Sequence, residues 1–477
     1  MNDAEIARAL DHHRAGRLAE AEAAWRRALD ADPGHAGVLH NLGVIEAQRG
    51  RHTAALSLFD RALAVRPDYA EAHLNRAGVL RALARYDDAI AACDRVIALR
   101  PDHPEPYNGK GEALQQQGKL DAAAICYEQA LARHPGHYGA RLGLGVVLTA
   151  LGRYEAAATH FRATLALRRG DHPLEPDHRS FRTTSRLKLR HDVAQFRYLE
   201  ATGVDAERYR ALADSYNAID RQMRWPENEA EIVPLPEALR ATIAESYGRP
   251  CHLVDAPTIA GGALNADLDA AAIARRYADK TPGVAFCDGL LKPEALASLR
   301  RFLLGSTIWF DFAHIGGFLA AYLEDGMACP LLLQIGNEIR AAFPDIIRGH
   351  PLNQAWAFKC LTGERGIGVH ADAAAISVNF WITPDSANME PERGGLIVYR
   401  RLPPPDWRLT GYDADMAAIR DFVREVDARD TVAVPYSENR AVLFDGDLFH
   451  ESGAVRFRPG YENHRINITL LYGRRRR

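Results

Sequence analysis

Two side chains that can bind a metal stand close together in the stretch GIGVHADAAAISVNFWIT, residues 366–383. His370 and Asp372 are two residues apart there, so in extended backbone both side chains leave the same face. His450, at the end of the downstream stretch VLFDGDLFH, supplies a third ligand. Two imidazoles and one carboxylate form a set that holds Fe(II) on one side and leaves other positions open. The alternative is a polar turn or an ion pair ahead of a buried strand.

Other residues compete for a metal role. Asp445 and Asp447 lie on the segment that delivers His450, where they can instead solvate the strand or orient a ligand. His191 and Asp192 resemble the doublet of metal phosphohydrolases only weakly, because the further histidine and aspartate of such a site have no recognisable place. A packed or salt-bridged helix residue is the favoured interpretation. A cupin would need His-x-His followed by a glutamate, which is absent.

A site with two neutral imidazoles and one carboxylate keeps a net positive charge around its metal, which suits an anionic co-substrate. The stretch HRINITLLYG places Arg465, Asn467 and Thr469 on one face of a strand. An arginine aimed into a barrel needs an anion, and a guanidinium binds a carboxylate at two points. Arg456 and Arg458 are rivals for this role, but they precede the Pro-Gly turn at 459–460 and are expected on a loop.

Together these residues resemble the Fe(II)/2-oxoglutarate-dependent dioxygenase superfamily, and its prolyl hydroxylase-like members in particular, over residues 282–477. The resemblance implies a double-stranded β-helix (jelly roll) in which His370, Asp372 and His450 bind iron. It also implies that Arg465 anchors the distal carboxylate of 2-oxoglutarate. Further cofactor-binding residues by the same resemblance are Asn467, Asn379 and Trp381.

The resemblance also implies the reaction, which is hydroxylation driven by O₂ and 2-oxoglutarate with release of succinate and CO₂; ascorbate is a reductant that such enzymes can use. Gly394 and Gly395 resemble the start of a strand in prolyl hydroxylase-like members. Cys360 stands where these relatives often carry a tyrosine that contacts 2-oxoglutarate. RINIT further resembles the signature of nucleic-acid demethylases, but a later arginine is missing and no basic groove is evident, so nucleic acid is not the expected substrate.

These residues need a sheet to position them, and the composition turns towards short strands from about Pro282. Residues 171–281 open with a Pro- and His-rich linker and then show helical spacing, which predicts a helical connector or an N-terminal extension of the oxygenase. Between Arg401 and Thr431 an insertion with a helical stretch could form a rim that selects substrate or could serve packing. The fold class expected for the whole chain is multidomain, α and α+β.

The first third of the chain repeats with a period of 34 residues, because prolines recur at that interval. The recurring positions are Pro33, Pro67, Pro101 and Pro135; Ala21, Ala55, Ala89 and Ala123; Trp25, Phe59, Cys93 and Tyr127; and turn residues Gly16, Gly50, Ala84, Gly118 and Gly152. This pattern resembles the tetratricopeptide family over about residues 2 to 170. The resemblance implies about five helix pairs in a domain 1–170, an α-solenoid that ends at Arg169.

Stacked helix pairs form a concave groove, and such grooves usually hold peptides. Asn41 and Asn75 lie one repeat apart and could hydrogen-bond an extended chain or simply solvate the groove. The expected partner is therefore a protein or peptide, and an oligomer is compatible with such an array. Three functions stay open: hydroxylation of a recruited protein, a scaffold or sensor, and oxidation of a small molecule or nucleic acid with the repeats serving assembly.

Composition limits the class of protein and the compartment that can be expected. The chain has 477 residues, 47% hydrophobic and 25% charged, which is typical of a globular protein of two or three domains. The six cysteines form no C-x-x-C pair, so reduced thiols are expected. The formal net charge is −3, and the basic run Arg474 to Arg477 is expected to be a solvated end. No leader or membrane-spanning stretch is recognised, and the expected location is cytoplasmic.

Overall fold

A computed structural model describes residues 3–312, 317–361, 366–404, 407, 416–453 and 455–473. The chain divides into two compact units, Met1–Val147 and Leu148–Arg477. Each unit is described by itself. The domain boundaries at 170 and 281 stay predictions.

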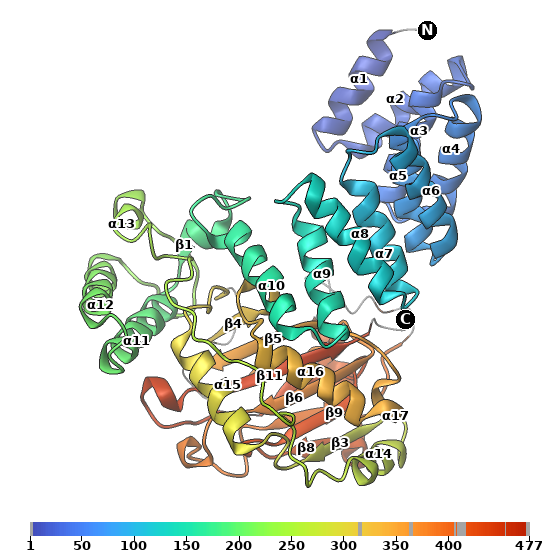
Figure 1. Ribbon diagram of the computed structural model, residues 1–477. Coiled ribbons are helices and arrows are strands. Elements are labelled where there is room, and N and C mark those ends of the chain that lie inside the picture. The colour runs from blue at the N-terminus through green and yellow to red at the C-terminus, as the bar shows by residue number, and fades with distance from the viewer. Residues whose placement is uncertain are drawn as a thin grey trace. The chain divides into compact units, whose positions relative to one another are not determined.

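The first unit consists of antiparallel helix pairs (Figure 1). Its helices are α1 (Asp3–Arg14), α2 (Leu18–Ala31), α3 (Ala36–Gln48), α4 (His52–Val65), α5 (Ala70–Ala82), α6 (Tyr86–Leu99), α7 (Glu105–Gln116) and α8 (Leu120–Arg133). The boundary of the unit, at Val147, falls within α9 (Tyr138–Ala150). Ala21, Ala55, Ala89 and Ala123 are fully buried, as the repeat predicts for a close helix approach.

The turn within each helix pair needs a left-handed backbone. Gly16, Gly50, Gly118 and Gly152 have φ between 71° and 75°, and Ala84 takes φ 56° at the equivalent position. Glycine adopts this conformation without the steric cost that a Cβ brings. The turn at Ala84, which has alanine where the other four turns have glycine, is therefore the strained one. The turns predicted from the repeat are confirmed.

The second unit combines helices with antiparallel sheets. Its helices are α10 (Tyr154–Arg169), α11 (Arg186–Ala201), α12 (Ala206–Gln222), α13 (Glu237–Ala241), α14 (Ala270–Ala278), α15 (Pro293–Gly305), α16 (Pro330–Ala342), α17 (Pro344–Ile347) and α18 (Met416–Arg424). Short 3₁₀ turns are η1 (Arg179–Phe181), η2 (Leu323–Asp325), η3 (Asp385–Ala387), η4 (Ala428–Asp430) and η5 (Tyr461–Asn463). No described helix is long and apolar enough to cross a membrane.

The larger sheet has the strand order β3-β9-β6-β11-β5-β4, all antiparallel. Its strands are β3 (Val284–Cys287), β4 (Phe318–Tyr322), β5 (Leu352–Cys360), β6 (Ile376–Trp381), β9 (Ala441–Asp445) and β11 (Arg465–Tyr472). A three-stranded sheet has the order β10-β7-β8, built from β7 (Leu396–Tyr399), β8 (Thr431–Val434) and β10 (His450–Ser452). A two-stranded sheet joins β1 (Thr183–Thr184) and β2 (Val233–Pro234).

The two faces of the larger sheet have different roles. Val284, Trp381 and Phe444 of the larger sheet share one buried cluster with Val398 and Val434 of the smaller sheet, so one face looks inward between the sheets. On the opposite face, α16 crosses the strands (Figure 1), and Tyr472 Oη donates to Gly336 O at 2.6 Å. Polar side chains on the inward face are therefore enclosed by both sheets.

Candidate functional site

The three residues that the sequence singles out as metal ligands meet in the structure. One donor atom from each of His370, Asp372 and His450 lies within 4.8 Å of the others. His450 Nε2 is 3.6 Å from Asp372 Oδ2, and the two imidazole centroids are 4.2 Å apart. In the described part of the chain no second group of three His, Cys, Asp or Glu residues lies this close.

The backbone fixes the two histidines against each other. His370 N donates to His450 O at 3.0 Å, and His450 N donates to His370 O at 2.8 Å. His450 begins β10, where it pairs with Val398 of β7. The segment before β6 and the segment after β9 are thus joined by two hydrogen bonds at the residues that carry the imidazoles.

Hydrogen bonds also orient each ring. Nδ1 of His370 lies 2.8 Å from Gly368 O, and Nδ1 of His450 lies 3.1 Å from Leu448 O. A carbonyl accepts only from a protonated nitrogen, so Nδ1 carries the proton and Nε2 keeps its lone pair. Burial, with a smaller contribution from His370, lowers the pKa of His450 to about 4 and keeps the imidazole neutral. Neutral imidazoles are the form that binds metals.

Asp372 is held by a residue that the sequence analysis did not single out. Ser377 Oγ donates to Asp372 Oδ2 at 2.6 Å, and the Ser377 side chain is fully buried in β6. A hydrogen bond of this kind limits the rotation of the carboxylate. Ser377 follows Asp372 by an odd number of residues across a bend, so no simple alternation could have identified the pair.

Arg465 lies on the inward face of β11 and is 1% exposed. Its Nε donates to Gly394 O at 2.6 Å, and Nη1 is 3.9 Å from Cys360 Sγ. No carboxylate of the described residues forms an ion pair with it. A buried guanidinium without a counter-ion is costly, so the site is suited to an anion.

The polar residues predicted beside Arg465 form one row. Asn467 Nδ2 donates to Asn379 Oδ1 at 3.2 Å, and the Thr469 hydroxyl also donates to Asn379 Oδ1. The Arg465 guanidinium carbon lies 5.7 Å from the Trp381 ring centroid. Trp381 Nε1 is buried and finds no acceptor within the described ranges. The row therefore carries an unused donor next to the arginine.

The rival residues lie in different surroundings. The Arg456 side chain is 62% exposed and reaches Glu390 at 3.5 Å, and Arg458 is exposed as well. Asp447 is buried but stands outside the group of three ligands. Asp192 forms a buried ion pair with Lys188, which matches the packed, salt-bridged interpretation of that doublet.

The insertion between Arg401 and Thr431 is partly outside the described residues. Its helix α18 packs Ile419, Phe422 and Val423 against Phe449, with Val369 and Ala371 alongside. Val369 and Ala371 alternate with the two predicted ligands, so this helix covers the back of the metal motif. The described part of the insertion thus serves packing, and the run Arg474 to Arg477 lies outside the described residues.

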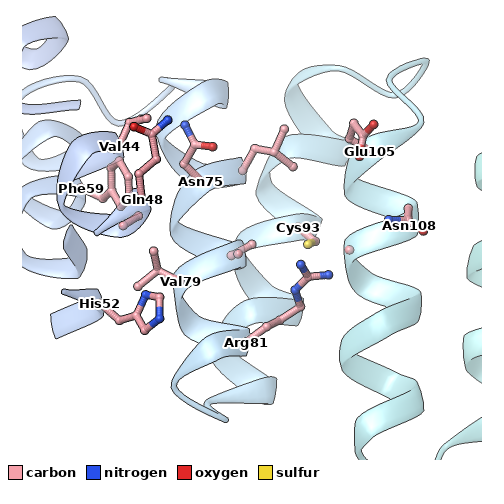
Figure 2. Close-up of a pocket in the computed structure, with 15 residues that line it drawn as sticks. Val44, Gln48, His52, Phe59, Asn75, Val79, Arg81, Cys93, Glu105 and Asn108 are labelled. Atoms are coloured by element: carbon pink, nitrogen blue, oxygen red, sulfur yellow. The ribbon is translucent and has the colours of Figure 1, made fainter. Parts of the chain in front are cut away.

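The first unit holds a pocket of about 520 Å³ lined by residues of α3, α4, α5, α6 and α7 (Figure 2). Asn75 lines it and donates to His40 Nε2 at 2.8 Å, whereas Asn41 is absent from the lining and contacts His40 Nδ1 at 3.3 Å. Asn108, which the sequence analysis missed, also lines the pocket and is 8% exposed, with an Oδ1 that has no donor among the described residues.

Comparisons with known proteins identify the first region. Two family models described as tetratricopeptide repeat match the chain, one over residues 6–64 and 108–172 and the other over residues 46–113. The N-terminal region is therefore an array of tetratricopeptide repeats, as the period predicts. None of the curated proteins compared matches the chain.

Solved structures resemble the same region. The crystal structure of MamA is 24% identical over 32% of this chain and 90% of that chain, with a TM-score of 0.31. MamA 41-end from Desulfovibrio magneticus RS-1 is 21% identical over 36% of this chain and 96% of that chain, with a TM-score of 0.34. YrrB, a TPR protein with an unusual peptide-binding site, is 22% identical over 37% of this chain and 87% of that chain, with a TM-score of 0.31.

Proposed function

We propose that the second unit is an Fe(II)- and 2-oxoglutarate-dependent oxygenase. The observation that carries this proposal is the convergence of His370, Asp372 and His450, whose donor atoms lie within 4.8 Å of one another. The donor set fits Fe(II), because both imidazoles present Nε2 and the carboxylate is oriented by Ser377. When bound, the iron supplies activation of O₂ coupled to decarboxylation of 2-oxoglutarate to succinate and CO₂.

The chain's own residues bind and orient the co-substrate. Arg465 offers a buried guanidinium to the distal carboxylate, and its Nε bond to Gly394 O fixes the plane of that group. The bonds of Asn467 and Thr469 to Asn379 keep the floor of the site rigid. The Trp381 indole donor is available for an acceptor on the bound molecule. Burial of Asp372, His450 and Arg465 limits the access of water to this part of the site.

The fold that suits this role is a double-stranded β-helix. In support, residues of the six-stranded and three-stranded sheets pack in one cluster, and His450 begins a strand of the smaller sheet while Arg465 begins a strand of the larger one. The two sheets would thus contribute the metal ligands and the anion-binding arginine to a common interior.

The tetratricopeptide repeats serve this enzyme as a recruiting arm for a protein or peptide substrate. Asn75 and Asn108 stand on the first helices of successive repeats, and the pocket between them has both apolar and polar walls (Figure 2). Such a pocket suits a side chain of an extended segment. A scaffold or sensor, and an oxygenase for a small molecule, remain the alternatives, with the repeats serving assembly in the second.

Turnover of 2-oxoglutarate to succinate tests the central proposal. Full-length protein with Fe(II) and O₂ should form succinate, and His370→Ala protein should not. Mass spectrometry of lysate proteins treated with each form should then find residues that gain 16 Da only with the active enzyme. Equal succinate formation by both forms would refute the assignment. A gain of 16 Da that is found only in metabolites, and not in proteins, would favour the small-molecule alternative.

A further inference from the structure

A second cavity of about 290 Å³ lies within the second unit, beside α10, η1, β4 and β5. Three guanidinium groups line it, those of Arg168, Arg169 and Arg179. We call it the arginine cavity. None of its lining residues belongs to the group of metal ligands or to the row beside Arg465.

Two of the three arginines of the arginine cavity, Arg169 and Arg179, have donors to spare. The Arg169 side chain is 6% exposed, and it donates through Nη1 to Ser180 Oγ at 2.7 Å and through Nη2 to Asp325 Oδ2 at 3.3 Å. Its Nε is buried without an acceptor among the described residues. Arg179 is exposed and forms no ion pair within the described ranges. A buried N–H without an acceptor is costly, which indicates that an acceptor is missing.

The acidic side chains of the arginine cavity, by contrast, are already engaged. Asp325 accepts from Arg168 at 2.6 and 3.1 Å as well as from Arg169. Asp311 Oδ2 accepts from the hydroxyl of Tyr322 at 2.9 Å.

Glu324 is the third acid, and its Oε1 lies 3.5 Å from the amide nitrogen of Gln354. Burial is the main cause that raises the pKa of Glu324 and so disfavours its charged form. The groups left without a partner are therefore the Nε donor of Arg169 and the charge of Arg179. A ligand that satisfies both accepts hydrogen bonds and carries negative charge.

An aromatic row connects the arginine cavity to the candidate co-substrate site. Tyr322, which lines the cavity, lies 6.3 Å from the ring of Trp356; Trp356 lies 6.0 Å from Phe358, and Phe358 lies 5.1 Å from Phe318. Phe318 pairs in register with Cys360.

The aromatic row reaches Arg465 through Cys360, whose Sγ lies 3.9 Å from Arg465 Nη1. The aromatic side chains and Arg465 lie on the same face of neighbouring strands, because they share the alternation of β4, β5 and β11. The arginine cavity is thus at the far end of the surface that begins at the anion-binding arginine.

We propose that the arginine cavity is a substrate subsite that binds an oxyanion, either a carboxylate or a phosphate group. On a peptide this group would belong to an acidic or phosphorylated residue near the residue that is oxidised. The link to substrate rests on the proposed oxygenase function, whereas the binding of an oxyanion does not.

Calorimetric titration of the full-length protein with inorganic phosphate and with acetate, at constant ionic strength and without iron or 2-oxoglutarate, tests the binding. Arg179→Ala should fold, since that side chain is exposed, and should weaken binding at least tenfold. Arg182→Ala is the matched control, because Arg182 is exposed, pairs with Asp177 and lies outside the lining. Binding of phosphate alone assigns a phosphate group, and comparable binding of acetate assigns a carboxylate. No binding, or equal binding by wild type and Arg179→Ala, would overturn the subsite.

Product analysis tests the link to substrate. Peptides that gain 16 Da with wild type but not with Arg179→Ala should carry an acidic or phosphorylated residue near the modified position. Equal products from both forms would overturn the substrate role. Oxyanion binding without any 2-oxoglutarate turnover would instead refute the oxygenase and leave the cavity as an anion site.

Discussion

The hydroxyl of Ser377 donates a hydrogen bond of 2.6 Å to Oδ2 of Asp372, and both side chains are buried. This contact ties the predicted carboxylate ligand to β6, the strand that also carries Asn379 and Trp381. We expect Ser377→Ala to weaken Fe(II) binding by about 10- to 100-fold, which is the usual effect of removing a partner of a metal ligand. Titration with Fe(II) under anaerobic conditions measures the change. Ser377→Thr, which keeps the hydroxyl, should recover most of the affinity, and equal affinity in wild type and Ser377→Ala would show that the contact does not matter for metal.

The metal ligands themselves have a spectroscopic test. Fe(II) and 2-oxoglutarate without oxygen should give a weak visible charge-transfer band in the wild type. His370→Ala, Asp372→Ala and His450→Ala should each lose it, because a set of two ligands no longer holds the metal in place. Asp447→Asn serves as the control, since Asp447 is buried nearby but stands outside the group of three. A band that persists in all three variants, or disappears only in the control, would refute the assignment.

Arg465 is expected to bind 2-oxoglutarate rather than metal. Arg465→Ala should keep Fe(II) affinity but weaken 2-oxoglutarate binding by about 2 to 4 kcal/mol, since a buried carboxylate loses its charged partner. The dissociation constants of both ligands should be measured separately. Arg456→Ala and Arg458→Ala are the controls, because those arginines are exposed. If either control loses 2-oxoglutarate binding while Arg465→Ala retains it, the strand-based assignment is wrong.

Gly78 provides a way to close the repeat pocket without damage to the fold. A Cβ added at Gly78 meets no atom within 4 Å, and Gly78 lines the pocket within α5. Gly78→Phe should therefore fold, helped by a gain in helix propensity of a few tenths of a kcal/mol. It should raise the apparent KM for a recruited protein substrate and leave uncoupled 2-oxoglutarate turnover unchanged.

Ile125→Phe is a suitable control for this change, because Ile125 is 55% exposed on α8 and lies outside the pocket lining. Asn75→Ala combined with Asn108→Ala should act in the same direction as Gly78→Phe. Deletion of residues 1 to 170 would be a poorer test, because it removes α10, whose Arg168 and Arg169 hold Asp325. Unchanged kinetics on the protein substrate in Gly78→Phe would favour repeats that serve assembly.

Lys359 should make stability depend on pH. The side chain is fully buried on the outer face of β5, where Nζ donates to Tyr461 Oη at 2.9 Å and lies 3.4 Å from His191 Nε2. Burial lowers the pKa of Lys359 well below its usual value, although Asp192 opposes this shift and Lys188 adds to it.

Between the folded and unfolded pKa values of Lys359 the unfolded chain binds more protons, so its free energy of unfolding rises with pH by up to about 1.4 kcal/mol per unit. Lys359→Met should remove this slope and raise stability at neutral pH. Urea unfolding at several pH values measures it. Tyr461 keeps its bond to Leu304 O at 2.7 Å in the variant, so no hydroxyl is orphaned. A steeper pH dependence in Lys359→Met would contradict the expectation.

Local sequence patterns predict some features of this structure and not others. The period of 34 residues predicts the helix pairs and even the strained turn at Ala84, since the same local backbone recurs in every unit. Alternation likewise places Arg465, Asn467 and Thr469 on one face, and all three are buried there.

Other features depend on which distant segments pair, and no local pattern contains that information. The contact of Ser377 with Asp372 forms only across a bend, and the arginine cavity joins α10 to β4 and β5. Asn41 and Asn75 look equivalent in the repeat, yet only Asn75 lines the pocket. Periodicity predicts the side of a helix, whereas the neighbouring helices determine which residues remain accessible.

The position of β11 has a consequence for how the protein is made. It is the last strand of the described chain, yet it lies in the interior of the larger sheet between β5 and β6. A ribosome delivers those two strands first, so each waits with an open edge until residues 465–472 emerge. The repeats, whose contacts are local, can fold early during translation, whereas the sheet must await a distant segment. Chaperone demand should therefore concentrate on the second unit, and Arg465 takes its buried place in the same event that closes the sheet.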